Sequence, residues 1–153
     1  MNFQLELAPG ALVAERYIVQ RVLGRGGFAI TYLAHDKVAD RLVALKELAP
    51  QGSTRLNGHL ELPDAANASR HRLVHQFLRE AKLLARLRLP GVVQIYDAFQ
   101  FGGTVYSVME YLADAVSLDR VLAANGALPY PRALRIIVQV AESLEDIHRA
   151  GYL

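Results

Sequence analysis

The pattern of apolar and polar residues predicts two kinds of element along the chain. Stretches rich in β-branched and aromatic residues favour five strands, at 17–23, 30–33, 42–48, 92–101 and 104–112. Apolar residues three and four positions apart favour three helices, one from about 69 to 89 and the others at 118–124 and 131–150. Gly102 and Gly103 indicate a tight hairpin between the last two strands. The sequence therefore predicts an α+β fold in which three strands, a helix, two strands and two helices follow one another.

The segments between these elements contain turn-forming residues. Residues 1–15, with Pro9 and Gly10, are expected to form a loose lead-in. Residues 49–69 contain several prolines and glycines and no periodicity, so we expect a solvated loop. Arginines at its ends could recognise a phosphorylated partner, although a solvated loop edge is the favoured interpretation. These arginines are Arg55, Arg70 and Arg72.

The composition narrows the function classes. The chain has 153 residues, of which 52% are hydrophobic and 21% charged, and this balance is typical of a globular protein. A net charge of +2 is too small to indicate binding to nucleic acid or to a membrane surface. The absence of cysteine excludes disulfides and a thiolate nucleophile. No segment is as long as a membrane span, so a soluble cytoplasmic protein is expected.

A glycine-rich stretch between the first two strands is the strongest candidate for chemistry. Gly24, Gly26 and Gly27 follow one strand-forming run and precede another. Glycines allow close backbone approach and positive φ, so that amide N–H groups can face an anion such as a phosphate. The third strand carries Lys46, whose ammonium could neutralise that anion. We therefore predict that a nucleoside triphosphate binds beneath this hairpin.

Two other readings of single motifs are weaker. Gly24, Gly26 and Ala29 also match the dinucleotide-binding pattern of Rossmann folds, which requires a helix directly after the glycines. A strand-forming run follows here instead, so this reading ranks third. His71 and His75 could hold a metal ion from one helix face, but their context favours a solvated pair, and we predict no metal ligands in this chain.

The first helix carries a carboxylate within its apolar stripe. Glu80 lies between Phe77 and Leu84, where a carboxylate turned toward the core requires a cation. Lys46 is the candidate partner. A glutamate at the edge of the stripe that reaches water is the alternative.

Taken together, these motifs resemble the protein kinase family, and in particular bacterial serine/threonine kinases. The motifs that carry the resemblance occur in the order of the family and are Gly24-Arg25-Gly26-Gly27-Phe28-Ala29, Val43-Ala44-Leu45-Lys46, Glu80, Val108-Met109-Glu110-Tyr111-Leu112 and the helical stretch 144–153. The resemblance implies a kinase N-lobe over 16–112, with a five-stranded antiparallel sheet and one helix. Residues 113–153 would be the first two helices of the C-lobe.

The resemblance also implies a role for each site residue. The backbone amides of Arg25, Gly26, Gly27, Phe28 and Ala29 would cradle the β- and γ-phosphates beside Gly24, and Lys46, held by Glu80, would contact the α- and β-phosphates. Leu23, Thr31 and Ala44 would cover the adenine, Met109 would be the gatekeeper, and main-chain groups of Glu110 and Leu112 would bond the edge of the base. Ala29 departs from the family because it replaces the usual third glycine.

Kinases of this family transfer the γ-phosphate of ATP to protein serine or threonine hydroxyls with the help of Mg²⁺. The catalytic and metal-binding loops that would follow in the family are not in this sequence, so Mg²⁺ ligands would lie beyond Leu153. We expect an ATP-binding portion that is inactive alone and that exposes the apolar stripe of 131–150. The alternative is a pseudokinase-like regulatory scaffold.

Overall fold

The computed structural model describes residues 5–63 and 67–151 and contains a sheet, a small hairpin and helices. Its strands are β1 (Leu12–Val13), β2 (Tyr17–Arg25), β3 (Ala29–Asp36), β4 (Arg41–Leu48), β5 (Thr54–Leu56), β6 (His59–Glu61), β7 (Ile95–Phe101) and β8 (Thr104–Glu110). Its helices are α1 (Asn67–Ala85), α2 (Leu118–Asn125) and α3 (Tyr130–Arg149). The chain divides into two compact units, one made of Met1–Arg86 with Gln94–Tyr111, the other of Leu87–Val93 with Leu112–Leu153.

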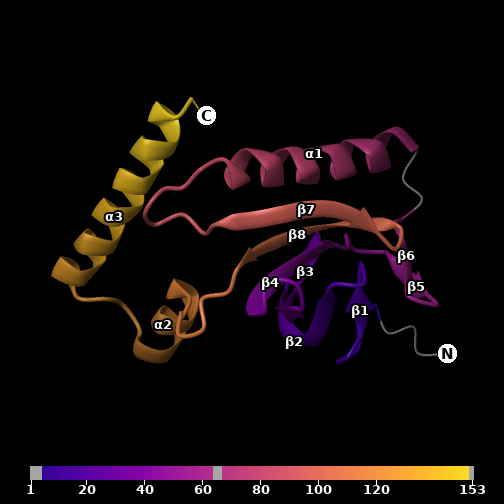
Figure 1. Ribbon diagram of the computed structural model, residues 1–153. Coiled ribbons are helices and arrows are strands. Elements are labelled where there is room, and N and C mark those ends of the chain that lie inside the picture. The colour runs from indigo at the N-terminus through magenta and orange to yellow at the C-terminus, as the bar shows by residue number, and fades with distance from the viewer. Residues whose placement is uncertain (1–4, 64–66, 152–153) are drawn as a thin grey trace. The chain divides into compact units, whose positions relative to one another are not determined.

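The first unit is built on an antiparallel sheet with the strand order β1-β2-β3-β4-β8-β7. Five of these strands are the predicted ones, and the two-residue strand β1 extends the sheet at one edge. Helix α1 runs along β7 (Figure 1) and packs Leu73, Val74, Phe77 and Leu78 against the core. The predicted α+β fold is thus confirmed.

The sheet is curled, so that strands near its two edges meet. Tyr17 on β2 stacks on Phe99 of β7, with ring centroids 5.5 Å apart. Phe99 also stacks on Tyr106, its cross-strand partner on β8. Aromatic pairs of this kind stabilise a sheet beyond the area they bury. The curl places the largest buried side chains on one face of the sheet.

The predicted hairpin between β7 and β8 is confirmed. Gly102 and Gly103 connect Phe101 to its partner Thr104, and their φ angles are +54° and +82°. A two-residue turn that matches the twist of its strands needs positive φ at both positions, which glycine adopts without a steric penalty.

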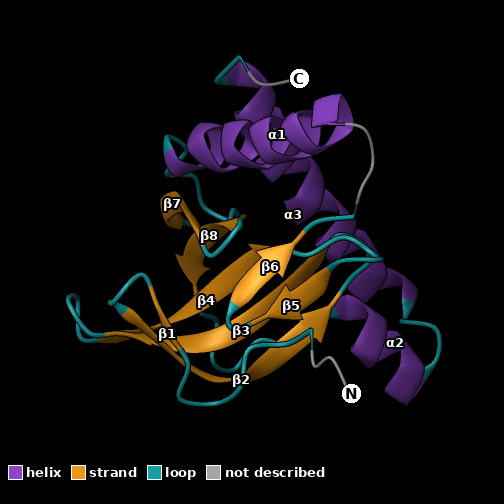
Figure 2. Ribbon diagram, turned by 90° about the vertical axis from the view of Figure 1, so that its right-hand side faces the viewer, coloured by secondary structure: helices purple, strands orange, loops and turns teal. Residues whose placement is uncertain are grey.

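Two segments expected to be loose are structured instead. Residues 54–61 form the β5–β6 hairpin, with Arg55 and Leu60 buried, so the prediction of a solvated loop was wrong for this part of 49–69. In the lead-in, Leu5 and Leu7 pack against the core. Figure 2 shows the β5–β6 hairpin over strands β3 and β4. Both segments cover the face of the sheet that its strands alone would leave open to water.

The second unit contains α2 and α3, whose predicted bounds agree with the structure to within one residue. No residue of α3 is buried, and Ile137, Val140 and Leu144 are all exposed, as expected for its apolar stripe. Within the same unit, Gly91, Val92 and Val93 line a groove together with residues of α3. None of the described helices is both long and apolar enough to cross a bilayer.

A buried carboxylate at the β3–β4 turn gives the fold an acid-sensitive ion pair. Arg16 donates two hydrogen bonds of 2.7 Å to Asp36, which is 1% exposed and also accepts the N–H groups of Val38 and Ala39. The hydrogen bond from Arg16 lowers the pKa of Asp36 to about 2. Because the unfolded carboxyl titrates near 3.9, this stabilisation is present above about pH 4 and is lost as the pH falls toward 2.

We expect Asp36→Asn to lower the free energy of unfolding at pH 7 by about 2 kcal/mol. The difference from the parent chain should shrink to near zero by pH 2, as measured by urea denaturation at each pH. Asp40→Asn is the matched control, because the Asp40 carboxylate in the same turn is 93% exposed. A difference for Asp36→Asn that stays constant with pH would contradict this account.

Candidate functional site

The glycine-rich turn joins two paired strands and is not followed by a helix. Strand β2 ends at Arg25 and β3 begins at Ala29, with Gly26, Gly27 and Phe28 between them. The N–H of Gly26 donates to the Ala29 carbonyl at 2.9 Å and closes the turn. A dinucleotide-binding motif needs a helix N-terminus at this point, so the Rossmann reading is excluded.

The glycines of this turn leave open space above the backbone. The expected positive φ is absent at Gly24, Gly26 and Gly27, although it occurs at glycines elsewhere in the described chain. A Cβ added at Gly24 or Gly27 would have no other atom within 4 Å, and one at Gly26 would meet only the Ala29 carbonyl oxygen at 3.8 Å. The glycines therefore matter here for the access they give to the backbone.

A cavity of about 270 Å³ opens beside this turn, within the first unit. Its lining comes from the turn, from β4 and the inner face of α1, and consists of Phe28, Ala29, Lys46, Leu48, Leu73, Gln76, Phe77 and Glu80. The ammonium of Lys46 lies 5.6 Å from the centre of the Phe77 ring. The cavity thus combines apolar walls with one cation and one carboxylate.

Lys46 and Glu80 line the same cavity but are not joined by a salt bridge. Among the described residues, no ion pair connects them. Glu80 is exposed, so the expectation of a carboxylate turned into the core was wrong, and the alternative of a stripe-edge glutamate that reaches water describes this conformation. The pairing of Glu80 with Lys46 remains a prediction.

The residues expected around the adenine follow the strands beside the cavity. Across β3, β4 and β8, Thr31 pairs with Lys46, and Ala44 pairs with Met109. Since side chains alternate along a strand, these four residues share one face of the sheet. Leu23 occupies a bulge of β2, between the paired residues 22 and 24.

The end of β8 was expected to bond the edge of the base. The N–H of Glu110 donates to the Gln94 carbonyl at 2.9 Å, so the carbonyl of Glu110 is the group that a base could use. Leu112 belongs to the second unit and is exposed.

Comparison with known proteins identifies the family of this arrangement. The family model described as "Protein kinase domain" matches residues 17–153. The chain belongs to the protein kinase family. Among solved structures, this kinase chain is similar to PpkA-294 in its apo form, with a TM-score of 0.86 at 24% identity, which shows the fold alone. It is also similar to the PknI kinase domain of Mycobacterium tuberculosis, with a TM-score of 0.75 at 28% identity.

Curated relatives of the kinase chain are bacterial serine/threonine-protein kinases. It is 32% identical to the probable kinase pknA2 of Bifidobacterium longum over 95% of its length, and 34% identical to PrkC of Bacillus subtilis over 92%. It spans 18% and 19% of the length of these two relatives, and 54% and 53% of the PpkA-294 and PknI chains.

The main polar network of the kinase chain was missed by the sequence analysis. Glu47, next to Lys46 on β4, is fully buried and accepts two hydrogen bonds from Arg55 on β5, at 2.7 and 2.6 Å. It also accepts hydrogen bonds from the hydroxyls of Tyr32, at 2.8 Å, and Tyr106. A signal was present, because alternation places Glu47 on the apolar face of Val43 and Leu45.

This network is ionic at its centre and neutral at its edge. Burial lowers the pKa of Arg55, but the hydrogen bond and charge of Glu47 outweigh it and hold the pKa above its usual value. Burial, followed by the charge of Glu47, raises the pKa of the Tyr32 and Tyr106 hydroxyls. Both tyrosines therefore stay neutral donors to Glu47, and Arg55 stays charged.

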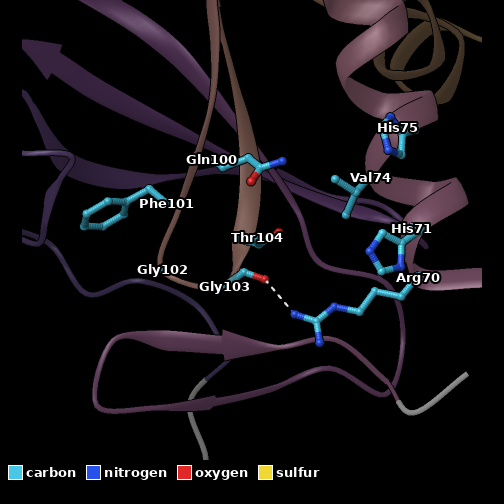
Figure 3. A pocket seen from close by; sticks show the side chains of 9 residues that line it. All are labelled: Arg70, His71, Val74, His75, Gln100, Phe101, Gly102, Gly103 and Thr104. Atoms are coloured by element: carbon cyan, nitrogen blue, oxygen red, sulfur yellow. Dashed lines mark hydrogen bonds between the residues drawn. The ribbon is translucent and has the colours of Figure 1, made fainter. Parts of the chain in front are cut away.

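A second cavity of the first unit, of about 440 Å³, lies between the start of α1 and the β7–β8 turn (Figure 3). Its lining residues are Arg70, His71, Val74, His75, Gln100, Phe101, Gly102, Gly103 and Thr104. Arg70 reaches the Gly103 carbonyl at 3.5 Å, and Phe101 points away from the helix. This cavity contains neither the glycine-rich turn nor Lys46. Arg55, grouped with Arg70 and Arg72 in the sequence analysis, is instead buried against Glu47.

Proposed function

We propose that this chain binds ATP between the glycine-rich turn, β4 and α1, as the nucleotide-binding portion of a serine/threonine protein kinase. The observation that supports the proposal is the cavity shared by Phe28, Lys46 and Glu80, which come from three separate elements. A triphosphate needs backbone donors and a cation, and this cavity offers both.

The phosphates would lie between the turn and Lys46. No hydrogen bond from the N–H groups of Gly27 or Phe28 is found among the described residues, so these amides are the first candidates to cradle the β- and γ-phosphates. Lys46 would contact the α- and β-phosphates. We infer that Glu80 moves to Lys46 when nucleotide is bound, because the phosphates fix the ammonium in one place.

Adenine would lie over the face of the sheet that carries Thr31, Ala44 and Met109, with Leu23 at its rim. The carbonyl of Glu110 would accept a hydrogen bond from the base, and the main chain of Leu112 would supply the second. Met109 would be the gatekeeper at the back of the site.

Mg²⁺ would accompany ATP and neutralise phosphate charge, but we assign it no ligand in this chain. No group of three potential ligands (His, Cys, Asp or Glu) comes together among the described residues. Phosphoryl transfer depends on positioned carboxylates and metal-borne charge. We therefore propose that transfer of the γ-phosphate to protein serine or threonine is the activity of a complete kinase domain, and that this chain alone binds ATP without transferring phosphate.

Nucleotide titration of Lys46→Met tests this proposal. We expect the dissociation constant for ATP, measured by calorimetry, to rise at least about tenfold, because a charge-assisted contact to phosphate is lost. The melting temperature should stay unchanged, since Lys46 forms no ion pair that the variant would break. Lys82→Met is the matched control, because Lys82 is an exposed lysine elsewhere on α1.

Unchanged ATP affinity in Lys46→Met would contradict the proposed site. Phosphate transfer from labelled ATP–Mg²⁺ to a generic protein acceptor by the purified chain would contradict the proposed lack of catalysis.

A further inference from the structure

The buried carboxylate of Glu47 lies directly behind the proposed nucleotide site. Glu47 and Lys46 are adjacent on β4, so their side chains leave the sheet on opposite faces. Lys46 lines the cavity, whereas Glu47 is 0% exposed and held by Arg55, Tyr32 and Tyr106. Any movement of Glu47 along or across the strand is therefore transmitted to Lys46 through the shared backbone.

Arg55 uses the rest of its guanidinium to hold two segments that are remote from β4. Its Nε donates to the carbonyl of Leu5 at 2.7 Å, and its Nη1 donates to the carbonyl of Gly58 at 3.4 Å. The Leu7 N–H donates to the hydroxyl of Tyr32 at 3.2 Å. The N-terminal segment and the β5–β6 hairpin are thus fastened to the back of β4 through a single charged pair.

The same hairpin is joined to the glycine-rich turn by a short tether. After β4 ends, the Ala49 N–H donates to the carbonyl of Phe28 at 2.9 Å, and the Gln51 N–H donates to the carbonyl of Gly27 at 3.2 Å. Strand β5 begins at Thr54, three residues after Gln51. Segment 49–51 therefore connects the tip of the turn to the element that Arg55 anchors.

We propose that the Glu47–Arg55 pair is a positioning pair for the nucleotide site, which fixes β4 behind Lys46 and, through segment 49–51, fixes the tip of the glycine-rich turn. The inference rests on the proposed function, since it assigns the pair a role in triphosphate binding. A turn that is already ordered loses less conformational entropy when phosphate binds. Neither residue touches the cavity, so both act through Lys46, Gly27 and Phe28.

The test compares two double variants that each replace an ion pair by neutral groups. Glu47→Gln/Arg55→Met leaves no charge buried, so the variant is expected to fold. Arg16→Met/Asp36→Asn is the control, because this pair lies at the opposite end of the β2–β3 ladder from the glycine-rich turn. Both variants are made in the full 153-residue chain.

The first measurement is amide hydrogen exchange by NMR without nucleotide. In Glu47→Gln/Arg55→Met, protection of the Ala49 and Gln51 amides should fall at least about tenfold, while amides at the centre of β4 and β8 keep theirs. The control variant should keep protection at Ala49 and Gln51. Unchanged protection of these two amides in the Glu47→Gln/Arg55→Met variant would overturn the inference.

The second measurement is the ratio of ATP affinity to adenosine affinity. A loss of folded protein weakens both ligands by the same factor, whereas a mispositioned Lys46 and turn weaken ATP alone. We expect the ratio to fall about tenfold in Glu47→Gln/Arg55→Met and to stay unchanged in the control. An unchanged ratio would overturn the positioning role. If the parent chain itself does not prefer ATP over adenosine, the proposed function fails, and the exchange measurement alone decides whether the pair orders the turn.

Discussion

Replacing Arg55 by methionine is expected to remove about 3 to 5 kcal/mol from the free energy of unfolding. The guanidinium supplies both short hydrogen bonds and the only cation that contacts Glu47 among the described residues. Without it, a carboxylate that is fully buried faces only two phenol hydroxyls, from Tyr32 and Tyr106. An uncompensated buried charge destabilises a fold far more than the lost contact itself. Urea denaturation followed by circular dichroism measures the effect.

Two further variants separate this charge effect from a general effect of losing an arginine. Arg70→Met removes an exposed arginine whose bond to Gly103 is 3.5 Å long, so its stability should change by no more than about 0.5 kcal/mol. Adding Glu47→Gln to Arg55→Met should restore most of the lost stability, because the buried charge disappears. A loss below about 1 kcal/mol for Arg55→Met would show that water or another cation reaches Glu47.

Gly103→Ala is expected to destabilise the chain by about 3 kcal/mol, through backbone strain combined with a steric clash. Gly103 has a φ of +82°, and a Cβ there would overlap the backbone carbonyl of Leu60 and the imidazole of His59. Leu60 is fully buried, and its N–H donates to the Gly102 carbonyl at 2.7 Å. The clash would therefore lift strand β6 off the β7–β8 turn and open the core beneath it. Urea denaturation gives the free energy of unfolding.

Gly58→Ala provides the matched control for this prediction. Gly58 has almost the same backbone conformation, with a φ of +80°, but a Cβ there would have no atom within 4 Å. Only the strain of a left-handed backbone remains, at about 1 kcal/mol. Equal losses for Gly58→Ala and Gly103→Ala would mean that the close approach of β6 to the turn contributes nothing to stability.

Much of the fold could be predicted because its signals are local. Strand-forming runs, the glycine pair 102–103 and the helical periodicity of 131–150 each lie within one element. The glycine-rich turn was predicted for a similar reason, since the β-prone run after Gly27 distinguishes a hairpin from a helix N-terminus. The kinase resemblance then followed from the order of short motifs, each of which can be read without knowing where the others lie in space.

The environment of the two carboxylates could not be predicted in this way. Periodicity gives the direction of Glu80 around its helix, but it does not say how closely the helix packs against the sheet, and the structure leaves Glu80 exposed. For Glu47 the alternation of β4 pointed inward, yet its partner Arg55 lies in a stretch whose prolines and glycines carry no period.

The amino-acid sequence by itself determined the strands, the helices, the glycine-rich turn and the strand position of Lys46, because hydrophobic pattern and glycine content act over a few neighbouring residues. Only the tertiary structure decided that segment 54–61 is a hairpin and that Arg55 is buried against Glu47. The physical reason is that burial of a charge becomes favourable only when its counter-charge and hydrogen-bond donors arrive from distant segments. That arrival is a property of the packed chain and has no signature in either segment alone.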